Sequence, residues 1–271
     1  NGGHPMGGSP VGSQTLYWRF DEGQGITANS AIQSKPNGTL TNMDSPASAT
    51  SGWTSSGKFN KGIMFDGSDD AVILANANAG TVNFNTNEPF TISTWIYATS
   101  DPINDEAIIA KWDLTNNQTG YYLRLSNDDS DSTGNITAVI RNKTTTDSLS
   151  VSSPIDSIAK NTWYHLVMKY EKGFNTGNDS DRLKLYINGA MVDYQWCNCS
   201  PLEATTADFT VGDFDPDDVD DSNLPFTGII DEVQVYNSAL TDDQIKILYN
   251  SNSSINASTG QVESASTVDG T

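Results

Sequence analysis

The chain alternates between hydrophobic and polar residues over short stretches, with a period of two. In TWYHLVMKY (residues 162–170), two tyrosines, a leucine and a methionine occupy every second position, and RLKLYINGA (182–190) repeats the pattern up to an Asn188–Gly189 turn signal. Because alternate residues of a strand face opposite sides of a sheet, each stretch predicts a strand with one buried face. Together they predict an antiparallel hairpin around the polar loop NTGNDSD.

Similar alternation recurs along most of the chain, and turn-forming residues separate the stretches. Many short alternating strands predict an all-β sandwich built from two antiparallel sheets. The further predicted strands are TLYWRF, GIMFDG, AVIL, FTISTWIY, AIIAKW, YYLRLS, NITAVIRN and FTGIIDEVQVYN.

One stretch has a helical pattern, TDDQIKILYN at residues 241–250. Thr241 and Gln244 have the spacing of a capping box, and two aspartates follow the cap, where a helix dipole favours negative charge. Ile245 and Leu248 form an apolar stripe at helical spacing. We therefore expect one short C-terminal helix that packs against the sandwich.

The two ends of the chain lack this patterning. Residues 1–14 are rich in glycine and residues 251–271 in serine and threonine, which predicts an N-terminal extension and a C-terminal tail or linker around one domain, 15–250. The chain starts without an initiator methionine, so we expect a processed or trimmed chain.

A series of motifs resembles the LamG-like jellyroll domains of the concanavalin A-like lectin and glucanase superfamily. In chain order they are LYWRFDEGQG, GKFNKGIMFDGSDDAVIL, EPFTISTWIYA, AIIAKWD, GYYLRL, NTWYHLVMKYE, RLKLYINGAMV and FTGIIDEVQVYNSALTDDQIKILY. The resemblance covers roughly residues 15 to 250. It implies a two-sheet antiparallel jellyroll sandwich with the final helix against its rim, and it alone supplies the strand order.

The chain is strongly acidic, with 34 acidic and 14 basic side chains and a net charge of −20. Such a surface repels phosphate backbones and anionic membranes, which disfavours nucleic acid and lipid headgroups as partners and favours cations. No apolar run reaches the length of a membrane-spanning helix, so we expect no membrane insertion.

The acidic residues do not form a catalytic pair in the sequence. Retaining glycosidases need two carboxyl groups close together, yet the seven glutamates are isolated from one another. Asp231 and Glu232 are adjacent on a predicted strand, and adjacent strand residues point to opposite faces. His165 lies in a strand, where a packed histidine is the plainer interpretation. We expect no enzyme activity.

Two cysteines, Cys197 and Cys199, stand one residue apart. A disulfide between them would close a very small, strained ring, so we favour free or differently paired thiols over a mutual bond.

Two groups of carboxylates are candidate ligands of a structural Ca²⁺, which prefers clustered oxygen atoms. Asp213, Asp215 and Asp217 start like an EF-hand loop, but the glycine and the closing glutamate of that loop are missing. The alternative for this run is a solvated acidic loop. The family resemblance implies a second site between the first and last strands, at Asp21 and Asp231. For Asp231 the alternative is a strand-edge carboxylate that accepts hydrogen bonds.

Aromatic side chains near loops are candidates for stacking on sugars: Trp53, Trp112, Tyr121 and Trp196. For each, the alternative is a hydrophobic plug in the core.

These observations favour a non-catalytic extracellular or cell-surface module that acts by contact with other copies of itself or with surface proteins. An adhesive or structural subunit of a surface assembly or filament is the first hypothesis. The alternative is a carbohydrate-binding module attached to a larger secreted protein, with glycans as partners, and a polysaccharide-active enzyme is a more remote one.

Overall fold

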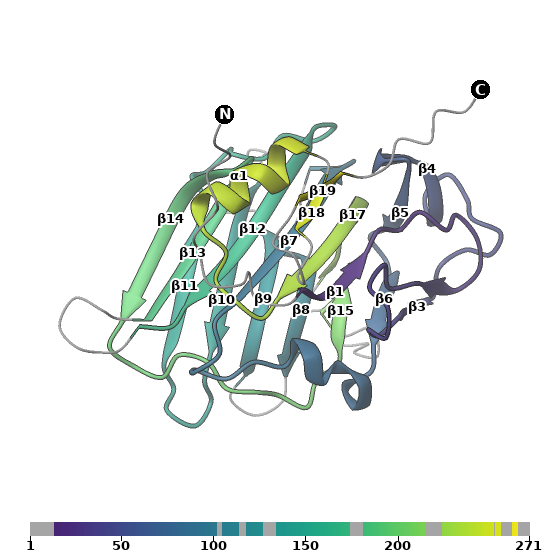
Figure 1. Ribbon diagram of the computed structural model, residues 1–271. Helices are drawn as coiled ribbons and strands as arrows, with labels where there is room; N and C mark the ends of the chain where they lie inside the picture. The colour runs from purple at the N-terminus through teal and green to yellow at the C-terminus, as the bar shows by residue number, and fades with distance from the viewer. Residues whose placement is uncertain are drawn as a thin grey trace, which may run out of the picture.

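Strands from distant parts of the chain assemble into two sheets that pack face to face (Figure 1). The computed structural model describes residues 14–101, 105–113, 118–126, 134–173, 181–214, 224–251, 253–255 and 262–264. The predicted all-β jellyroll sandwich with one short C-terminal helix is confirmed.

Sheet A consists of β1 (Gln14–Trp18), β4 (Gly52–Phe59), β5 (Lys61–Asp66), β7 (Phe90–Ala98), β12 (Trp163–Glu171), β13 (Asp181–Ile187), β14 (Ala190–Cys197) and β17 (Thr227–Tyr236). Its spatial order is β14–β13–β12–β7–β17–β5–β4, and β1 also pairs with β17. All of these pairings are antiparallel.

Sheet B consists of β2 (Thr27–Ala28), β3 (Gly38–Thr41), β6 (Ala71–Leu74), β8 (Glu106–Asp113), β9 (Thr119–Ser126), β10 (Asn135–Arg141), β11 (Ser148–Ser152), β15 (Phe209–Val211) and β16 (Leu224–Pro225). Its order is β11–β10–β9–β8–β15–β6–β3–β2, and the two-residue strand β16 adds a parallel pairing to β8. Outside the sheets lie a 3₁₀ helix, η1 (Asn76–Val82), the helix α1 (Asp242–Ser251) and a small pair, β18 (Ser253–Ile255) with β19 (Val262–Ser264).

The predicted hairpin is confirmed as β12 and β13, with Leu166 opposite Ile187 and Tyr170 opposite Leu183. The predicted turn at Asn188 and Gly189 connects β13 to β14. Both turn residues have positive φ angles, 52° and 77°, as a type I′ hairpin turn requires.

The core lies between the sheets and follows the alternation. Leu166 and Met168 of β12 are fully buried in one cluster with Leu123 and Leu125 of β9. Burial of apolar side chains at such positions supplies most of the favourable free energy of folding.

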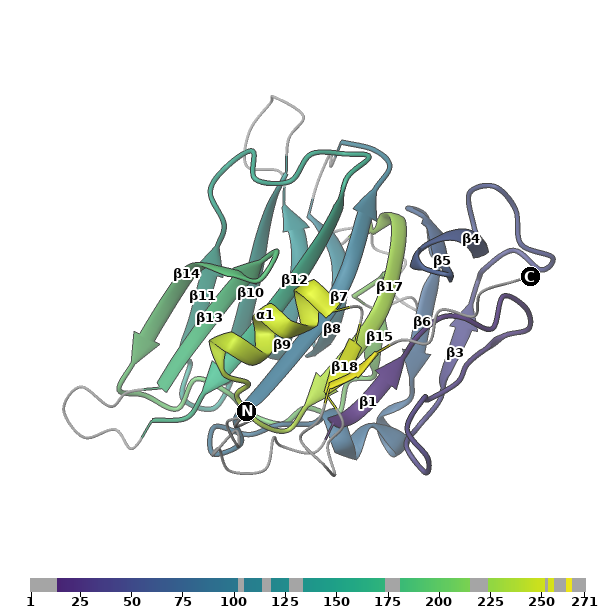
Figure 2. The ribbon, with the colours of Figure 1, turned by 45° about the horizontal axis from the view of Figure 1, so that its top comes forward.

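The helix α1 crosses the outer face of sheet A (Figure 2). Ile245 and Leu248 pack there against Val167 of β12 and Tyr186 of β13. The predicted capping box is confirmed, because Thr241 N donates to Gln244 Oε1 at 2.7 Å and Gln244 N to Thr241 Oγ1 at 3.2 Å.

A buried lysine fixes the start of α1. The Lys169 Nζ donates to Leu240 O and to Asp242 Oδ1, each at 3.0 Å. The helix therefore packs over β12 and β13 of sheet A.

The predicted domain limits at residues 14 and 251 stay predictions, since most of both tails lies outside the described residues.

Candidate functional site

Loops that join strands of both sheets surround a polar groove of about 750 Å³, which we call the rim groove. The loop before β7, the β10–β11 turn, the segment after β12 and the segment after β14 each contribute. The lining residues are Asn85, Thr86, Asn87, Glu88, Asn142, Thr144, Thr145, Lys172, Ser200, Leu202 and Glu203.

The groove's side chains hold one another in place. Asn142 Oδ1 accepts from the backbone of Thr144 and Thr145, at 2.9 and 3.2 Å. Glu203 crosses to the same turn, where Thr144 Oγ1 donates to both of its carboxylate oxygens, at 3.0 and 2.9 Å. On the other side, Glu88 Oε2 accepts from Asn85 N at 2.8 Å. A carboxylate oxygen has lone pairs for a further donor, so the bonded groups still offer acceptors to a ligand.

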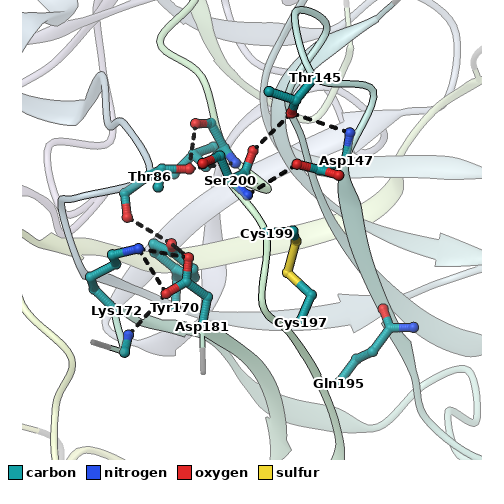
Figure 3. Close-up of a disulfide and its surroundings, with 12 residues drawn as sticks. Thr86, Thr145, Asp147, Tyr170, Lys172, Asp181, Gln195, Cys197, Cys199 and Ser200 are labelled. Atoms are coloured by element: carbon teal, nitrogen blue, oxygen red, sulfur yellow. Dashed lines mark hydrogen bonds and ion pairs between the residues drawn. A yellow bond between two sulfur atoms is a disulfide. The ribbon is translucent and has the colours of Figure 1, made fainter. Parts of the chain in front are cut away.

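A disulfide joins Cys197 to Cys199 beside this groove (Figure 3). The prediction of free or differently paired thiols is wrong, because the chain bends directly after β14 and sets the two Cα atoms 5.2 Å apart. Beyond the bond, Ser200 N donates to Asp147 Oδ2 at 3.0 Å, and Thr145 Oγ1 donates to Ser200 O at 3.2 Å. The disulfide therefore sits at the base of one groove wall.

A buried carboxylate fixes the opposite wall (Figure 3). Asp181 has no exposed surface, and its Oδ1 lies 2.9 Å from Lys172 Nζ. Tyr170 Oη donates to Asp181 Oδ2 at 2.9 Å. Burial, and then the Asp181 charge, raises the pKa of Tyr170, which keeps the phenol protonated as a donor. The ion pair with the buried Asp181 carboxylate, which Tyr170 also binds, thus holds Lys172 at the groove.

Trp196 precedes the disulfide and presents its ring to solvent. It is 60% exposed, and Tyr194, two residues earlier on the same face of β14, is 54% exposed. Trp196 lies opposite Arg182 in the sheet register. Among the four predicted ligand-binding aromatics, Trp196 alone offers a large open face.

The residues that alternate with these aromatics, Asp193 and Gln195, point the other way, toward sheet B. Gln195 Oε1 accepts from Ser150 N at 2.7 Å, and Asp193 Oδ2 accepts from Ser152 N at 3.0 Å. Ser150 and Ser152 belong to β11, which is an edge strand. The Gln195 and Asp193 side chains therefore accept from backbone N–H groups of β11 that would otherwise be open to pairing with another strand.

The other three predicted ligand-binding aromatics are mostly covered. Tyr121 is 1% exposed, packs on Phe90 in the core and offers no face to a ligand. Trp112 is 6% exposed on the outer face of sheet B. Trp53 is 9% exposed, donates to Gly25 O at 2.7 Å and lines a second hollow of about 370 Å³.

The predicted calcium ligands Asp21 and Asp231 take part in hydrogen bonds and an ion pair. Phe59 N donates to Asp231 Oδ2 at 3.0 Å, and Glu232 N donates to Asp231 Oδ1 at 2.8 Å. Asp21 pairs with Arg19 at 3.3 Å. Burial, followed by the Glu232 charge, raises the pKa of Asp231 well above its usual range. These contacts fit the hydrogen-bonding alternative for Asp231, and calcium at Asp21 and Asp231 stays a prediction.

The adjacent acids on β17 are sealed from solvent. Asp231 is 0% and Glu232 2% exposed, and Tyr17 Oη donates to Glu232 Oε2 at 2.5 Å. The register of β17 shifts between Asp231 and Gln234, so simple alternation of faces does not hold there. Burial raises the pKa of Glu232 to about 7. Carboxyls buried this deeply cannot reach a glycosidic bond.

The acidic run that starts at Asp213 is described only in part. Asp213 is 5% exposed, and Thr210 Oγ1 donates to its backbone oxygen at 2.5 Å. Asp215 and Asp217 lie outside the described residues, so calcium at this run stays a prediction.

The described residues also contain a cluster of three aspartates that the sequence did not predict. Asp66, Asp69 and Asp70 place carboxylate oxygens within 4.8 Å of one another. Asp70 is buried and already accepts from Ser51 Oγ at 3.0 Å and from Asp66 N at 3.0 Å. These bonds explain the buried carboxyl without a cation.

The family model of the concanavalin A-like lectin/glucanases superfamily matches residues 66–246. The chain belongs to this superfamily. The matched range begins at the end of β5 and ends within α1, so it includes strands of both sheets and the first part of the helix. No curated protein matches the chain.

Solved structures with the same fold include binding domains. Domain 4 of AbnA, a GH43 extracellular arabinanase from Geobacillus stearothermophilus in complex with arabinotriose, has a TM-score of 0.57 at 16% identity, covering 89% of this chain and all of that one. The binding domain of Paraclostridial Mosquitocidal Protein 1 has a TM-score of 0.59 at 15% identity, covering 89% of this chain and 53% of that one. The Ruminococcus gnavus IT-sialidase CBM40 bound to α2,3 sialyllactose reaches 0.51 at 20% identity, covering 64% and 88%.

Identities this low show a shared fold alone. The superfamily member spans about half the length of the toxin binding domains that it matches. Within the described residues no helix is long and apolar enough to cross a membrane.

Sequence reasoning missed the rim groove, although its loops carry a usable signal. The segments TNE, NKTTT and SPLE are rich in amides, hydroxyls and carboxylates that no strand pattern uses. They lie far apart in the chain, so only the fold brings them together.

Proposed function

We propose that this superfamily member is a non-catalytic carbohydrate-binding module that works outside the cell. The rim groove would hold the sugar hydroxyls, and Trp196 would stack on a neighbouring sugar ring. The observation that carries the proposal is the rim groove itself, a polar hollow built from four loops, one of which follows the exposed Trp196 in the chain.

The groove offers the chemistry that sugars need. Sugar hydroxyls both donate and accept, and the groove presents amides, hydroxyls, carboxylates and the Lys172 ammonium within one hollow of about 750 Å³. Because these side chains already bond to one another, little conformational freedom is lost when a ligand binds.

Trp196 adds an apolar face for stacking. Sugar rings carry patches of C–H groups that pack on indole, and such contacts contribute on the order of 1 kcal/mol. Trp196 is one residue from Cys197, and the disulfide fixes the turn that leads into the groove wall. The ring and the groove thus belong to one end of the sandwich.

Two structures with the same fold are described with bound saccharides, arabinotriose in one and sialyllactose in the other. They support a glycan as the class of ligand and leave its identity open. Contact with surface glycans would also serve adhesion. The first hypothesis, an adhesive subunit that contacts other copies or surface proteins, stays a prediction.

A glycan array followed by isothermal titration calorimetry tests the proposal. The array should identify at least one oligosaccharide, and calorimetry should then compare wild type with Trp196→Ala and with Met191→Ala. Met191 is an exposed apolar residue at the other end of the same strand, 46% exposed, and serves as the matched control.

We expect Trp196→Ala to weaken binding about tenfold, which is about 1.4 kcal/mol, and Met191→Ala to leave it unchanged. Melting curves should stay the same for both, since neither side chain is in the core. No glycan bound at millimolar concentration, or equal affinities of the two variants, would contradict the proposal.

A further inference from the structure

The outer face of sheet B carries a cluster that the rim groove does not use. On β9, Leu123 and Leu125 face the core, so Tyr122 and Arg124, which alternate with them, face outward. On β10, Ile140 faces the core and Arg141 faces outward by the same rule.

The strand register sets two arginines around one tyrosine. Arg124 follows Tyr122 by two positions on β9, and Arg141 pairs with Gly120, two positions before Tyr122. The guanidinium groups therefore approach Tyr122 from opposite ends of its strand. The Arg124 Cζ lies 5.3 Å from the centre of the Tyr122 ring.

Aromatic rings close the side of the cluster toward β8. The Trp112 and Phe214 rings meet the Tyr122 ring edge-on, with centroids 4.8 and 5.1 Å away. We call Trp112, Tyr122, Arg124 and Arg141 the aromatic–arginine face. It sets the half-buried Tyr122 ring, backed by the buried Trp112 and Phe214, beside two arginines.

The two arginines differ in how they are paired. Arg124 Nη1 lies 2.6 Å from Asp105 Oδ2, so a carboxylate neutralises it. Arg141 has no ion pair with any residue that the structure describes. The Nε atoms of both arginines are buried without a hydrogen-bond partner. A buried N–H without an acceptor is costly and calls for one.

An unpaired arginine is unexpected in this chain. It has 34 acidic side chains against 14 basic ones, so acidic partners are abundant. Tyr122 cannot neutralise Arg141, because burial raises the pKa of the phenol and keeps it uncharged near neutral pH. Among the residues that the structure describes, the charge of Arg141 therefore has no counter-ion.

We propose that the aromatic–arginine face binds an acidic saccharide, with a uronate carboxylate on Arg141 and the sugar ring against Tyr122. A guanidinium matches a carboxylate with two parallel hydrogen bonds, and a simple anion would make no use of the rings beside it. This site lies on sheet B and is independent of the rim groove and of Trp196.

Calorimetry at 0.15 M NaCl with trigalacturonic acid and with a neutral galactotriose tests this inference. The variants are Arg141→Gln, Arg141→Lys, Trp196→Ala and the control Lys246→Gln, which removes a positive charge from an exposed side chain on α1. Salt at this concentration screens the overall charge of −20 beyond about 8 Å, so the assay reports local contacts.

We expect Arg141→Gln to weaken trigalacturonate binding at least tenfold and Arg141→Lys to weaken it less, since lysine keeps the charge and loses the planar fork. Trp196→Ala and Lys246→Gln should leave it unchanged, whatever happens to neutral glycans at the rim groove. Melting curves should match wild type, because no ion pair of Arg141 is lost.

Four results would overturn the inference, and three of them come from the saccharide titrations. They are no trigalacturonate binding at millimolar concentration, equal affinities of Arg141→Gln and Lys246→Gln, and an equal loss of neutral galactotriose binding in Arg141→Gln. If sodium sulfate competed with an affinity equal to that of trigalacturonate, the site would likewise be one for simple anions and not for a saccharide.

Discussion

A single buried glutamate should make the stability of this protein depend on pH. Glu106 is 3% exposed at the start of β8, and its Oε2 accepts from Thr227 N at 3.1 Å. Burial raises the pKa of Glu106 to about 7, although the hydrogen bond from Thr227 partly opposes the shift. The substitution Glu106→Gln keeps an acceptor oxygen there and removes the charge.

The size of the effect follows from the two protonation equilibria. Between the ordinary glutamate value of 4.5 and about 7 lie about 2.5 pKa units, and at 1.36 kcal/mol each they amount to about 3 kcal/mol. A raised carboxyl pKa means that the folded state holds more protons than the unfolded state between these values. The wild-type free energy of unfolding should therefore fall as the pH rises from about 4.5 to 7, and stay low above it.

Urea unfolding at pH 4.5, 6 and 8 measures this difference. Glu106→Gln should equal wild type at pH 4.5 and be more stable by up to about 3 kcal/mol at pH 8. Asp44→Asn, which changes an exposed carboxylate, is the matched control and should run parallel to wild type. If Glu106→Gln also ran parallel to wild type, the argument from burial would fail.

Three further predictions concern the disulfide, the sheet edge and calcium. Cys199→Ser should lower the free energy of unfolding by about 1 to 2 kcal/mol, measured in urea, because the bond closes a very short loop. Asp193→Ala combined with Gln195→Ala should produce oligomers in light scattering, because it uncaps the β11 edge. Calcium should raise the melting temperature and EDTA lower it, and Asp215→Ala with Asp217→Ala should abolish the response, as mass action on a folded-state site requires.

Each of these has a clear contrary outcome. An unchanged denaturation midpoint in Cys199→Ser would show that the disulfide adds nothing to the fold. A variant without the two caps that stays monomeric at high concentration would show that the β11 edge needs no protection. A melting curve unaffected by EDTA, with no calcium in mass spectrometry, would leave the acidic run as a solvated loop.

The sequence predicted the strands whose two faces differ in environment. β12 and β13 alternate clearly because one face lies in the core and the other meets α1 or solvent. The edge strand β14 escaped prediction, although Val192, Tyr194 and Trp196 alternate with Asp193 and Gln195. The structure leaves every position of AMVDYQWC exposed or half-buried. The sequence did not distinguish the aromatics of β14 from buried ones, and the structure shows that Trp196 is exposed to solvent.

The candidate site was less predictable for physical reasons that differ from residue to residue. Alternation in YYLRLS already gives Tyr121 the same face as two core leucines, so its burial could have been foreseen, along with the outward direction of Tyr122. The rim groove depends on four loops that only the sheet topology brings together. The Cys197–Cys199 bond depends on a local bend, which residue spacing alone did not reveal.

The central claim is that the rim groove and Trp196 together bind a glycan. Calorimetric titration of the best array ligand into wild type and Trp196→Ala, with Met191→Ala as the control, tests it most directly. The account predicts saturable binding to wild type and to the control, and an affinity about tenfold weaker for Trp196→Ala. Equal affinity for all three proteins, or no saturable binding to wild type, would contradict it.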